Sequence, residues 1–437
     1  MNEAIEQIST SQLLDFIENE QGNLIDLRPA DAFNGWSMEN EKRGGHIKSA
    51  KSLPFKWTKY MDWIEVVHSK MISPENEMVL YAYSEDEIKK TTTLFNKAGF
   101  NKLKVYTGFK DEWSANSTLP MEQLARHKNL IYPELINQWL NGDKPTGLNA
   151  EDVVICHAHY RNRDAYLSGH IPGAIDIDTL ALESPKTWNR RTPDELEQAL
   201  LAHGITSDTT VILYGKFMSP NNDDPFPGSA AGHIGAIRSA FIMLYAGVKD
   251  VRVLNGGFQS WEDAGFEVSK EDVNKRPAHE FGATIPQKPE LAVDIEEAKT
   301  ILKSDEAELV CVRSLPEYLG EVSGYNYIEK TGRIPGAVFG NCGSDAYHME
   351  NYRNPDHTIK DFHEVAKIWK ETELTPDKHL AFYCGTGWRG SEAFFNAWLM
   401  GWPRVSVFDG GWFEWSNDPT NPIEKGHKNK VLSQKEA

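Results

Sequence analysis

Cysteine is scarce in this sequence: there are four in 437 residues, Cys156, Cys311, Cys342 and Cys384. No two of them form a C-x-x-C pair, and none has the spacing of a metal-ligand set. A disulfide scaffold is therefore excluded, and we expect neither a metal nor another cofactor. So few thiols in so long a chain indicate a reducing compartment, and the expected location is the cytoplasm.

An excess of positive charge and a long apolar run are also missing. The formal net charge is −18, which argues against nucleic acid or an anionic membrane as a partner. No apolar stretch reaches the length of a membrane span. The N-terminal stretch "MNEAIEQISTSQLLDFIENE" lacks the basic region and apolar run of a secretion signal, so none is expected. A periplasmic location stays open only if the sequence is truncated.

What the sequence does contain is one pattern, repeated three times along a chain long enough for several domains. In each copy an apolar strand precedes a G-[HR]-I-x-x-A turn, which reads "GHIKSA" from 45, "GHIPGA" from 169 and "GRIPGA" from 332. A second strand follows and ends at Ala82, Gly215 and Cys384 in turn. A helical stretch and a glycine-aromatic turn ("TGFKDEW", "NGGFQSW", "DGGWFEW") complete each copy. Such alternation predicts an α/β fold with parallel sheets flanked by helices.

The order of these motifs, together with "SGYNYIEKTGRIPGA" and "CGTGWRGSE" in the third copy, resembles the rhodanese family of sulfurtransferases. The likeness covers nearly the whole chain, and the arrangement is similar to that of the three-domain bacterial thiosulfate sulfurtransferases. It implies three tandem rhodanese-like domains, which we place at 1–127, 128–282 and 283–437. The linker-like stretches "STLPMEQLARHKN" and "SKEDVNKRPAHEFGATIPQKP" lie at these limits.

The stretch "FYCGTGWRGSEAFF", 382–395, sets Cys384 between a buried strand and a helix. Gly385 and Gly387 allow turns that a Cβ would hinder. Backbone N–H groups turned inward, with the N-terminus of the helix, would favour an anion such as a thiolate or a persulfide. The resemblance implies that the loop wraps these N–H groups around the cysteine sulfur.

The resemblance also implies roles for the loop residues. Cys384 is the expected catalytic nucleophile: it attacks the outer sulfur of thiosulfate, sulfite leaves, and an acceptor nucleophile later takes the persulfide sulfur. Arg389 is expected to bind the donor's anionic end, and Arg333 to act as a second cation. The remaining expected substrate-binding residues are Gly385, Thr386 and Gly387 in the loop, and Trp388 as an apolar wall that limits water.

The other two domains are expected to be inactive because Ala82 and Gly215 cannot act as nucleophiles. Cys156 and Cys342 are interpreted as buried apolar residues. Cys311 occupies the place of Asp26 ("VCVR" against "IDLR"), so the family's usual acid is missing from the third domain. A disulfide between Cys311 and Cys384 stays open. Structural roles are expected for three more residues: hydrogen bonds that hold turns for His46 and His170, and an ion pair for Arg313.

Three alternatives stay open. The donor could be 3-mercaptopyruvate, although Trp388 and Arg389 replace the Val-Thr usual in that branch and favour thiosulfate. A Cys-loop phosphatase or arsenate reductase is less favoured, because those loops have more than the four residues found here between Cys and Arg. The chain could also be a persulfide relay whose inactive domains dock a protein. The acceptor could be a thiol, cyanide or a sulfur-carrier protein.

We also expect an inactive domain to supply one wall of the catalytic pocket. In two-domain relatives the pocket lies at such an interface, where closure excludes water. An insertion at 217–230, "FMSPNNDDPFPGSA", reads as an exposed loop and is a candidate lid for this pocket.

Overall fold

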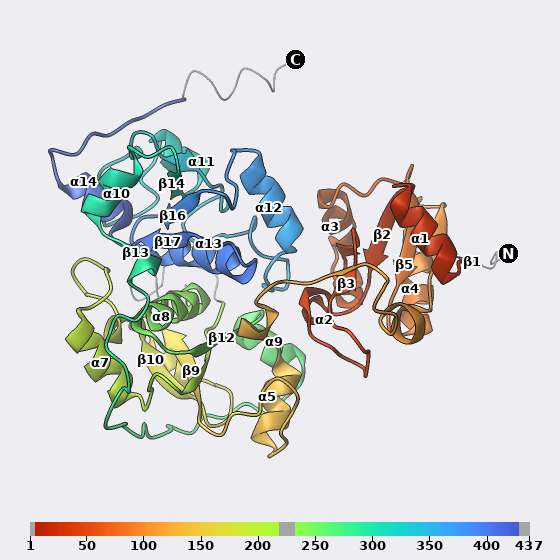
Figure 1. Ribbon diagram of the computed structural model, residues 1–437, viewed down its shortest axis with the longest axis horizontal. Coiled ribbons are helices and arrows are strands. Elements are labelled where there is room, and N and C mark those ends of the chain that lie inside the picture. The colour runs from red at the N-terminus through yellow and green to blue at the C-terminus, as the bar shows by residue number, and fades with distance from the viewer. Residues whose placement is uncertain (1–4, 218–231, 428–437) are drawn as a thin grey trace. The chain divides into compact units, whose positions relative to one another are not determined.

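The structure is a computed structural model that describes residues 5–217 and 232–427 (Figure 1). The chain divides into two compact units, residues 1–128 and 129–437. All but the first residue of the insertion at 217–230 lies outside the described residues, so its predicted role as a lid stays a prediction.

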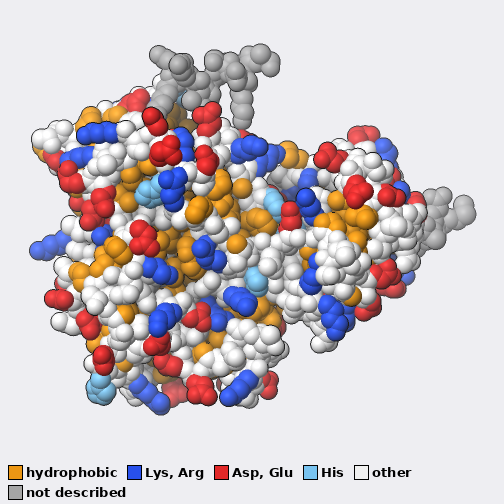
Figure 2. All heavy atoms as spheres, in the orientation of Figure 1, with side chains coloured by type: hydrophobic (Ala, Val, Ile, Leu, Met, Phe, Trp, Pro, Cys, Tyr) orange, Lys and Arg blue, Asp and Glu red, His pale blue; other side chains and the backbone are white. Residues whose placement is uncertain are grey.

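The surface carries both signs of charge. On the face drawn in Figure 2, acidic and basic side chains are intermingled. Among the described helices, none combines the length and the apolar character needed to cross a bilayer.

The smaller unit contains a five-stranded parallel sheet with the strand order β1-β6-β5-β2-β4. Its strands are β1 (Glu6–Gln7), β2 (Gly22–Asp26), β4 (Lys51–Ser52), β5 (Glu77–Tyr81) and β6 (Leu103–Val105). Its α-helices are α1 (Thr10–Glu18), α2 (Ala30–Asn34), α3 (Trp63–Ser69) and α4 (Glu85–Lys97). A short antiparallel pair joins β3 (His46–Ile47) to β7 (Met121–Glu122).

The larger unit contains two more five-stranded sheets, and every strand pair in them is parallel. The first has the order β10-β9-β11-β12-β8, with β8 (Leu130–Ile131), β9 (Val153–His159), β10 (Ile175–Asp178), β11 (Thr210–Tyr214) and β12 (Asp250–Leu254). The second has the order β13-β17-β16-β14-β15, with β13 (Ala292–Val293), β14 (Ala307–Cys311), β15 (Val338–Phe339), β16 (His379–Tyr383) and β17 (Val405–Phe408).

The helices of this unit accompany the two sheets in chain order. With the first sheet are α5 (Pro133–Leu140), α6 (Arg163–Leu167), α7 (Pro193–Ala202), α8 (Gly232–Ala246) and α9 (Gly257–Asp263). With the second are α10 (Ile295–Ile301), α11 (Leu315–Leu319), α12 (Phe362–Lys370), α13 (Trp388–Leu399) and α14 (Gly411–Asn417). The predicted α/β fold with three parallel sheets is confirmed. The limits 1–127, 128–282 and 283–437 stay predictions, and we refer to these ranges as domains 1, 2 and 3.

The three central strands explain why the sequence forms parallel sheets. β5, β11 and β16 read "EMVLY", "TVILY" and "HLAFY", and nearly all their residues are buried. Continuous apolar runs of this kind are typical of strands covered on both faces. Each ends in a tyrosine, paired in register with Asp26, His157 and Cys311 respectively. The prediction that Cys311 takes the place of Asp26 is therefore confirmed.

Domains 2 and 3 share a core. All 15 residues of α8 are buried, as expected for a helix that is apolar on every side. α13 packs against α8 at the middle of the unit (Figure 1), and the rings of Phe241 and Phe394 meet there with centroids 5.3 Å apart. Because α13 begins just after β16, this packing brings the carboxyl end of β16 to the interface between the two domains. Ligand sites of α/β sheets lie at such ends.

Candidate active site

Cys384 directly follows the central strand β16, and α13 begins four residues later at Trp388. Its side chain is buried, with 1% of the residue's surface exposed. Gly387 is the N-cap of α13 with φ +85°, a conformation that favours glycine. The sequence therefore predicted the strand, the loop and the helix correctly. The orphan N–H groups of the first helical turn lie immediately after the cysteine, where they favour negative charge.

The loop carbonyls are tied to the start of α14. Trp412 N–H donates to the Cys384 carbonyl at 2.8 Å, and Phe413 N–H donates to the Gly385 carbonyl at 2.9 Å. In a trans peptide the N–H points opposite to the C=O. The N–H groups of Gly385 and Thr386 consequently point away from α14. N–H groups turned in this way can stabilise an anion, although that of Gly385 already donates to the Tyr325 hydroxyl at 3.0 Å.

Arg389 forms a bidentate ion pair with Glu317. Nη1 and Nη2 lie 2.9 and 2.7 Å from the two carboxylate oxygens, and both side chains are buried. Burial opposes the charged guanidinium, but Glu317 holds the pKa of Arg389 well above its usual value. Glu317 is itself fixed by Ser314, whose N–H and Oγ donate to it as a capping box at the start of α11. The expected substrate arginine thus already has an anionic partner.

Tyr325 closes over the loop from a segment that the sequence analysis left without a role. Its hydroxyl accepts the N–H of Gly385 at 3.0 Å and a hydrogen bond from Arg389 Nη2. Since both contacts use the oxygen as acceptor, its own proton is left to donate elsewhere. Burial raises the pKa of Tyr325 well above its ordinary value, so the phenol keeps this proton at neutral pH. A Cβ on Gly385 would lie only 2.4 Å from the Tyr325 ring, which explains the need for glycine there.

A cavity of about 440 Å³ opens beside Cys384. Domain 3 lines it with Cys384, Thr386, Trp388, Arg389, Ala346, Tyr347 and the segment 324–327. Domain 2 lines it with Tyr160, Arg161, Trp188 and Ile234. The prediction that a domain without the nucleophile supplies a wall is confirmed for domain 2.

Aromatic rings dominate the cavity wall, and several are packed against one another. Trp388 meets Tyr160 edge-on with centroids 5.5 Å apart. The ring centroid of Tyr327 lies 4.9 Å from that of Trp188 and 5.3 Å from that of Tyr325. Ring faces carry partial negative charge, so such a wall suits an aromatic or quaternary-ammonium ligand. Trp388 lines the cavity as predicted.

Arg333 does not lie where we expected it. It is not among the residues that line the cavity, and its side chain is fully buried. Its Nη1 donates to the carbonyls of Tyr318 (3.2 Å) and Gly426 (2.7 Å), while Nη2 pairs with Glu424 at 3.0 Å. We therefore correct its assignment as a second substrate cation, because the guanidinium holds the turn together instead.

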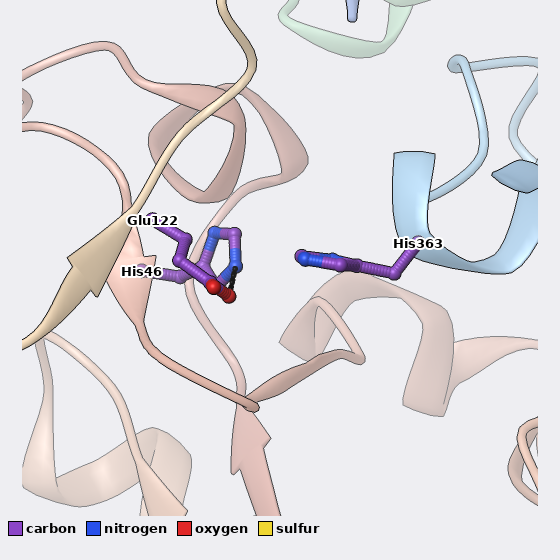
Figure 3. A group of neighbouring side chains, drawn as sticks. All are labelled: His46, Glu122 and His363. Atoms are coloured by element: carbon purple, nitrogen blue, oxygen red, sulfur yellow. Dashed lines mark ion pairs between the residues drawn. The ribbon is translucent and has the colours of Figure 1, made fainter. Parts of the chain in front are cut away.

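The histidines at the same repeat position hold their turns in the predicted way. His46 Nδ1 bonds the Phe33 carbonyl at 2.8 Å, and His170 Nδ1 bonds the Tyr166 carbonyl at 3.0 Å. His46 also lies 3.8 Å from a Glu122 carboxylate oxygen (Figure 3). Arg333 is thus the third member of a set of turn-holding residues.

The remaining cysteines are buried free thiols. Burial raises the pKa of Cys156 and of Cys342 to about 12, which fits their interpretation as inert side chains. Cys311 lies at the end of β14 and accepts a hydrogen bond from Arg313 Nε at 3.3 Å. Arg313 also donates to the Gly332 carbonyl at 2.6 Å, so its role is structural, through hydrogen bonds rather than the ion pair that we expected. Whether Cys311 and Cys384 can form a disulfide stays open.

Comparison with known protein families gives a match over all three repeats. The Rhodanese-like domain model matches residues 9–116, 149–264 and 294–418. Among curated proteins, Thiosulfate sulfurtransferase YnjE of Escherichia coli is 39% identical over 422 residues. The match covers 95% of this chain and 92% of YnjE.

Solved structures of a protein named EanB are also similar. Wild-type EanB is 61% identical, with a TM-score of 0.95 over 97% of this chain and 99% of EanB. A double cysteine-to-alanine variant in complex with hercynine is 60% identical, with the same TM-score and coverage. A tyrosine-to-phenylalanine variant carries a cysteine persulfide in a tetrahedral intermediate state with ergothioneine; it is 61% identical, with a TM-score of 0.95 over 97% of this chain and all of EanB.

Proposed function

We propose that this chain, which belongs to the Rhodanese family and is a sulfurtransferase, carries a sulfane sulfur on Cys384 and transfers it to C2 of hercynine, forming ergothioneine. One observation carries the proposal. The EanB structures single out two cysteines changed to alanine, a tyrosine, a threonine and the cysteine that bears the persulfide. This chain has the same residue types at identical spacing: Cys311, Cys342, Tyr325, Thr386 and Cys384.

The chemistry of the transfer balances without an outside oxidant. The terminal sulfur of the Cys384 persulfide bonds to C2 of the imidazole and makes that carbon tetrahedral. The S–S bond then breaks, its electron pair leaves on Cys384 Sγ as a thiolate, and C2 loses its proton. Carbon gives up the pair of electrons that the sulfane sulfur gains. The helix N-terminus and loop N–H groups stabilise both the persulfide and the leaving thiolate.

Tyr325 is the group we assign to proton transfer. Its hydroxyl is held by Gly385 and Arg389 as an acceptor, so its proton is available to the cavity that it lines. Donation to a ring nitrogen makes C2 electrophilic, and the proton lost from C2 restores the phenol. In this assignment Arg389 and Glu317 hold the Tyr325 phenol in place and do not bind the sulfur donor.

The cavity wall suits the two ends of hercynine, the trimethylbetaine of histidine. Its quaternary ammonium is matched by the aromatic rings of Tyr160, Trp188 and Tyr327, through cation–π attraction. Its carboxylate is matched by Arg161, which lines the same cavity from domain 2. The nucleophile-free domain would thereby contribute to recognition.

The second candidate concerns thiosulfate, either as the sulfur donor for the hercynine reaction or as the donor in a complete reaction with a simple acceptor. The likeness to YnjE and the "CGTGWR" loop support thiosulfate as the donor. The Cys384 thiolate would take its outer sulfur and release sulfite, and cyanide or a thiol would then accept the persulfide sulfur. 3-Mercaptopyruvate remains an alternative donor. Polysulfide would load the same cysteine.

The test is to supply polysulfide or thiosulfate together with hercynine and to quantify ergothioneine by mass spectrometry. We expect repeated turnovers, complete loss in Cys384→Ser, and retained activity in Cys156→Ala, which removes another buried thiol. Transfer to cyanide without any ergothioneine would contradict the hercynine assignment and favour the second candidate.

A further inference from the structure

A buried ionic cluster crosses the interface between domains 2 and 3 beside the Cys384 loop. Glu183 and Arg238 come from domain 2, and Asp409 comes from domain 3; all three are fully buried. Arg238 Nε lies 3.1 Å from Glu183, and its Nη2 lies 2.6 Å from Asp409. Arg190 completes the cluster, with Nη1 3.1 Å from Asp409.

Glu183 makes a direct contact with the catalytic loop. The indole N–H of Trp388 lies 3.0 Å from both of its carboxylate oxygens, and this N–H can only donate. Trp388 is the first residue of α13 and lines the cavity with Cys384. Domain 2 also packs against the ring itself, through Tyr160 edge-on and through Gly235, where a Cβ would lie 3.5 Å from the indole.

Arg238 reaches the loop as well. Its Nη1 lies 3.5 Å from Ser391 Oγ, and Ser391 donates through both N–H and Oγ to the Gly387 carbonyl at 2.8 and 2.7 Å. A Cβ on Gly387 would lie 3.0 Å from Arg238 Nη1 and 3.0 Å from the Asp409 carbonyl. The end of the catalytic loop at Gly387 is therefore in direct contact with the cluster.

A contribution to the stability of the interface does not by itself explain why these charged side chains are buried there. Burying an ion pair costs desolvation free energy, and apolar residues of similar volume often serve an interface as well or better. The adjoining contact of Phe241 and Phe394 shows that apolar side chains also serve this interface. A similar pair of an acid and an arginine lies at the end of the loop next to Cys384. There Glu317 pairs with Arg389, and Arg389 holds Tyr325, all within domain 3.

We propose that Glu183, in a domain without a nucleophile, is a positioning residue for sulfur transfer: oriented by Arg238, it fixes the Trp388 indole and with it one wall of the Cys384 cavity. The choice of hercynine as the acceptor in the test rests on the proposed function. The positioning role does not depend on the acceptor, because it concerns the loop that carries the persulfide.

The test is a double-mutant cycle on the full chain with Glu183→Ala, Trp388→Phe and the double variant, plus Glu183→Gln. Loading of Cys384 is followed as the mass of one added sulfur, and kcat and KM are measured with hercynine. Loss of both contacts to the indole N–H predicts that Glu183→Ala lowers kcat/KM on the order of tenfold while loading is retained. Glu183→Gln should recover part of this loss, because its amide oxygen still accepts the indole N–H.

The cycle decides between positioning and a merely structural role. If Glu183 acts through the indole N–H, Glu183→Ala should add little to the loss already seen in Trp388→Phe. Losses that simply multiply in the double variant, or a Glu183→Ala protein with unchanged kcat/KM, would overturn the proposal. Glu41→Gln is the matched control: Glu41 is a buried acid in domain 1, 3.0 Å from Arg28, and its change should alter stability without altering kinetics.

The same cycle is measured with cyanide as the acceptor. A wild-type protein that transfers sulfur to cyanide but leaves hercynine unchanged would refute the proposed function. The non-additive losses at Glu183 and Trp388 would then still support the positioning role with cyanide.

Discussion

Arg389 and Glu317 meet through two hydrogen bonds of 2.9 and 2.7 Å, and Arg389 lies in the first turn of α13, directly after the loop that carries Cys384. An arginine that follows a catalytic cysteine would ordinarily be assigned to the substrate's negative charge. Here both terminal nitrogens already contact a buried carboxylate, and Nη2 also contacts Tyr325. Substrate binding by Arg389 stays a prediction, and it competes with the role of fixing Glu317 and Tyr325.

The first prediction separates these roles by stability. Arg389→Ala leaves the buried Glu317 without its cation, which should destabilise the fold by about 3–5 kcal/mol. The double variant Arg389→Ala, Glu317→Ala should recover a large part of this free energy. Chemical denaturation measures both. If Arg389→Ala is as stable as wild type but has a raised KM for the sulfur donor, the substrate role is correct instead.

The second prediction concerns pH. Burial opposes ionisation of Glu317, yet Arg389 holds its pKa below the ordinary value of 4.5. The folded chain therefore binds this proton less tightly than the unfolded chain. The stabilisation is present above pH 4.5 and is lost as the pH falls through the folded pKa. The difference in unfolding free energy between wild type and Glu317→Gln should be largest near neutrality and shrink on acidification. A difference that grows in acid would contradict the sign.

The third prediction concerns Tyr325. Tyr325→Phe keeps the ring over Gly385 but removes the proton, so transfer to hercynine should slow on the order of a hundredfold. Loading of Cys384 by polysulfide should continue, because it needs no proton from this group. Tyr83→Phe in domain 1 is the matched control, since the Tyr83 hydroxyl likewise accepts a hydrogen bond from a buried arginine, Arg28, at 3.5 Å, while it donates to Glu41 at 2.7 Å. Equal slowing of loading and transfer would argue against the proton-transfer role.

The fourth prediction concerns Arg333. Loss of its hydrogen bonds to the Tyr318 and Gly426 carbonyls should lower the unfolding free energy of Arg333→Ala by about 1–3 kcal/mol. The KM for the sulfur donor should stay unchanged. Arg333→His places at this position the residue found in the other two repeats and should be milder. A raised donor KM in a stable Arg333→Ala protein would restore the role that we have corrected.

The fifth prediction concerns the domains. Residues 283–437 alone would expose the face of α13 that packs on α8 and would lose the cavity wall of Tyr160 and Trp188. We expect this fragment to be unstable or to have a strongly reduced kcat/KM. Residues 129–437 form a compact unit with the whole described cavity and should retain sulfur transfer. Thermal unfolding and kinetics compare both fragments with the full chain. A folded 283–437 fragment with full activity would contradict this account.

Local sequence carried enough information for the fold and for part of the site. The strand, the glycine loop and the helix around Cys384 are consecutive, so their pattern predicted them correctly. The repeats also predicted the parallel sheets and the place of Cys311. Arg333 was misassigned because an arginine that binds backbone carbonyls and one that binds a substrate look alike in sequence.

The partners of the loop could not be found in this way, because they are distant in the chain. Tyr325 is 60 positions from Gly385, Glu317 is 72 from Arg389, and Glu183 is 205 from Trp388. Only Glu317 left a local signal: "SLPE" has the spacing of a capping box at the start of a short helix. Which faces of domains 2 and 3 meet depends on packing of the buried α8, which periodicity alone does not orient.

The most direct measurement is a single turnover with sulfur of a heavy isotope. Cys384 is loaded from labelled polysulfide, excess donor is removed, and hercynine is added while intact protein and products are weighed by mass spectrometry. We predict that the protein loses one labelled sulfur and that an equal amount of labelled ergothioneine forms. A persulfide that survives hercynine yet is discharged at once by cyanide would contradict the central claim.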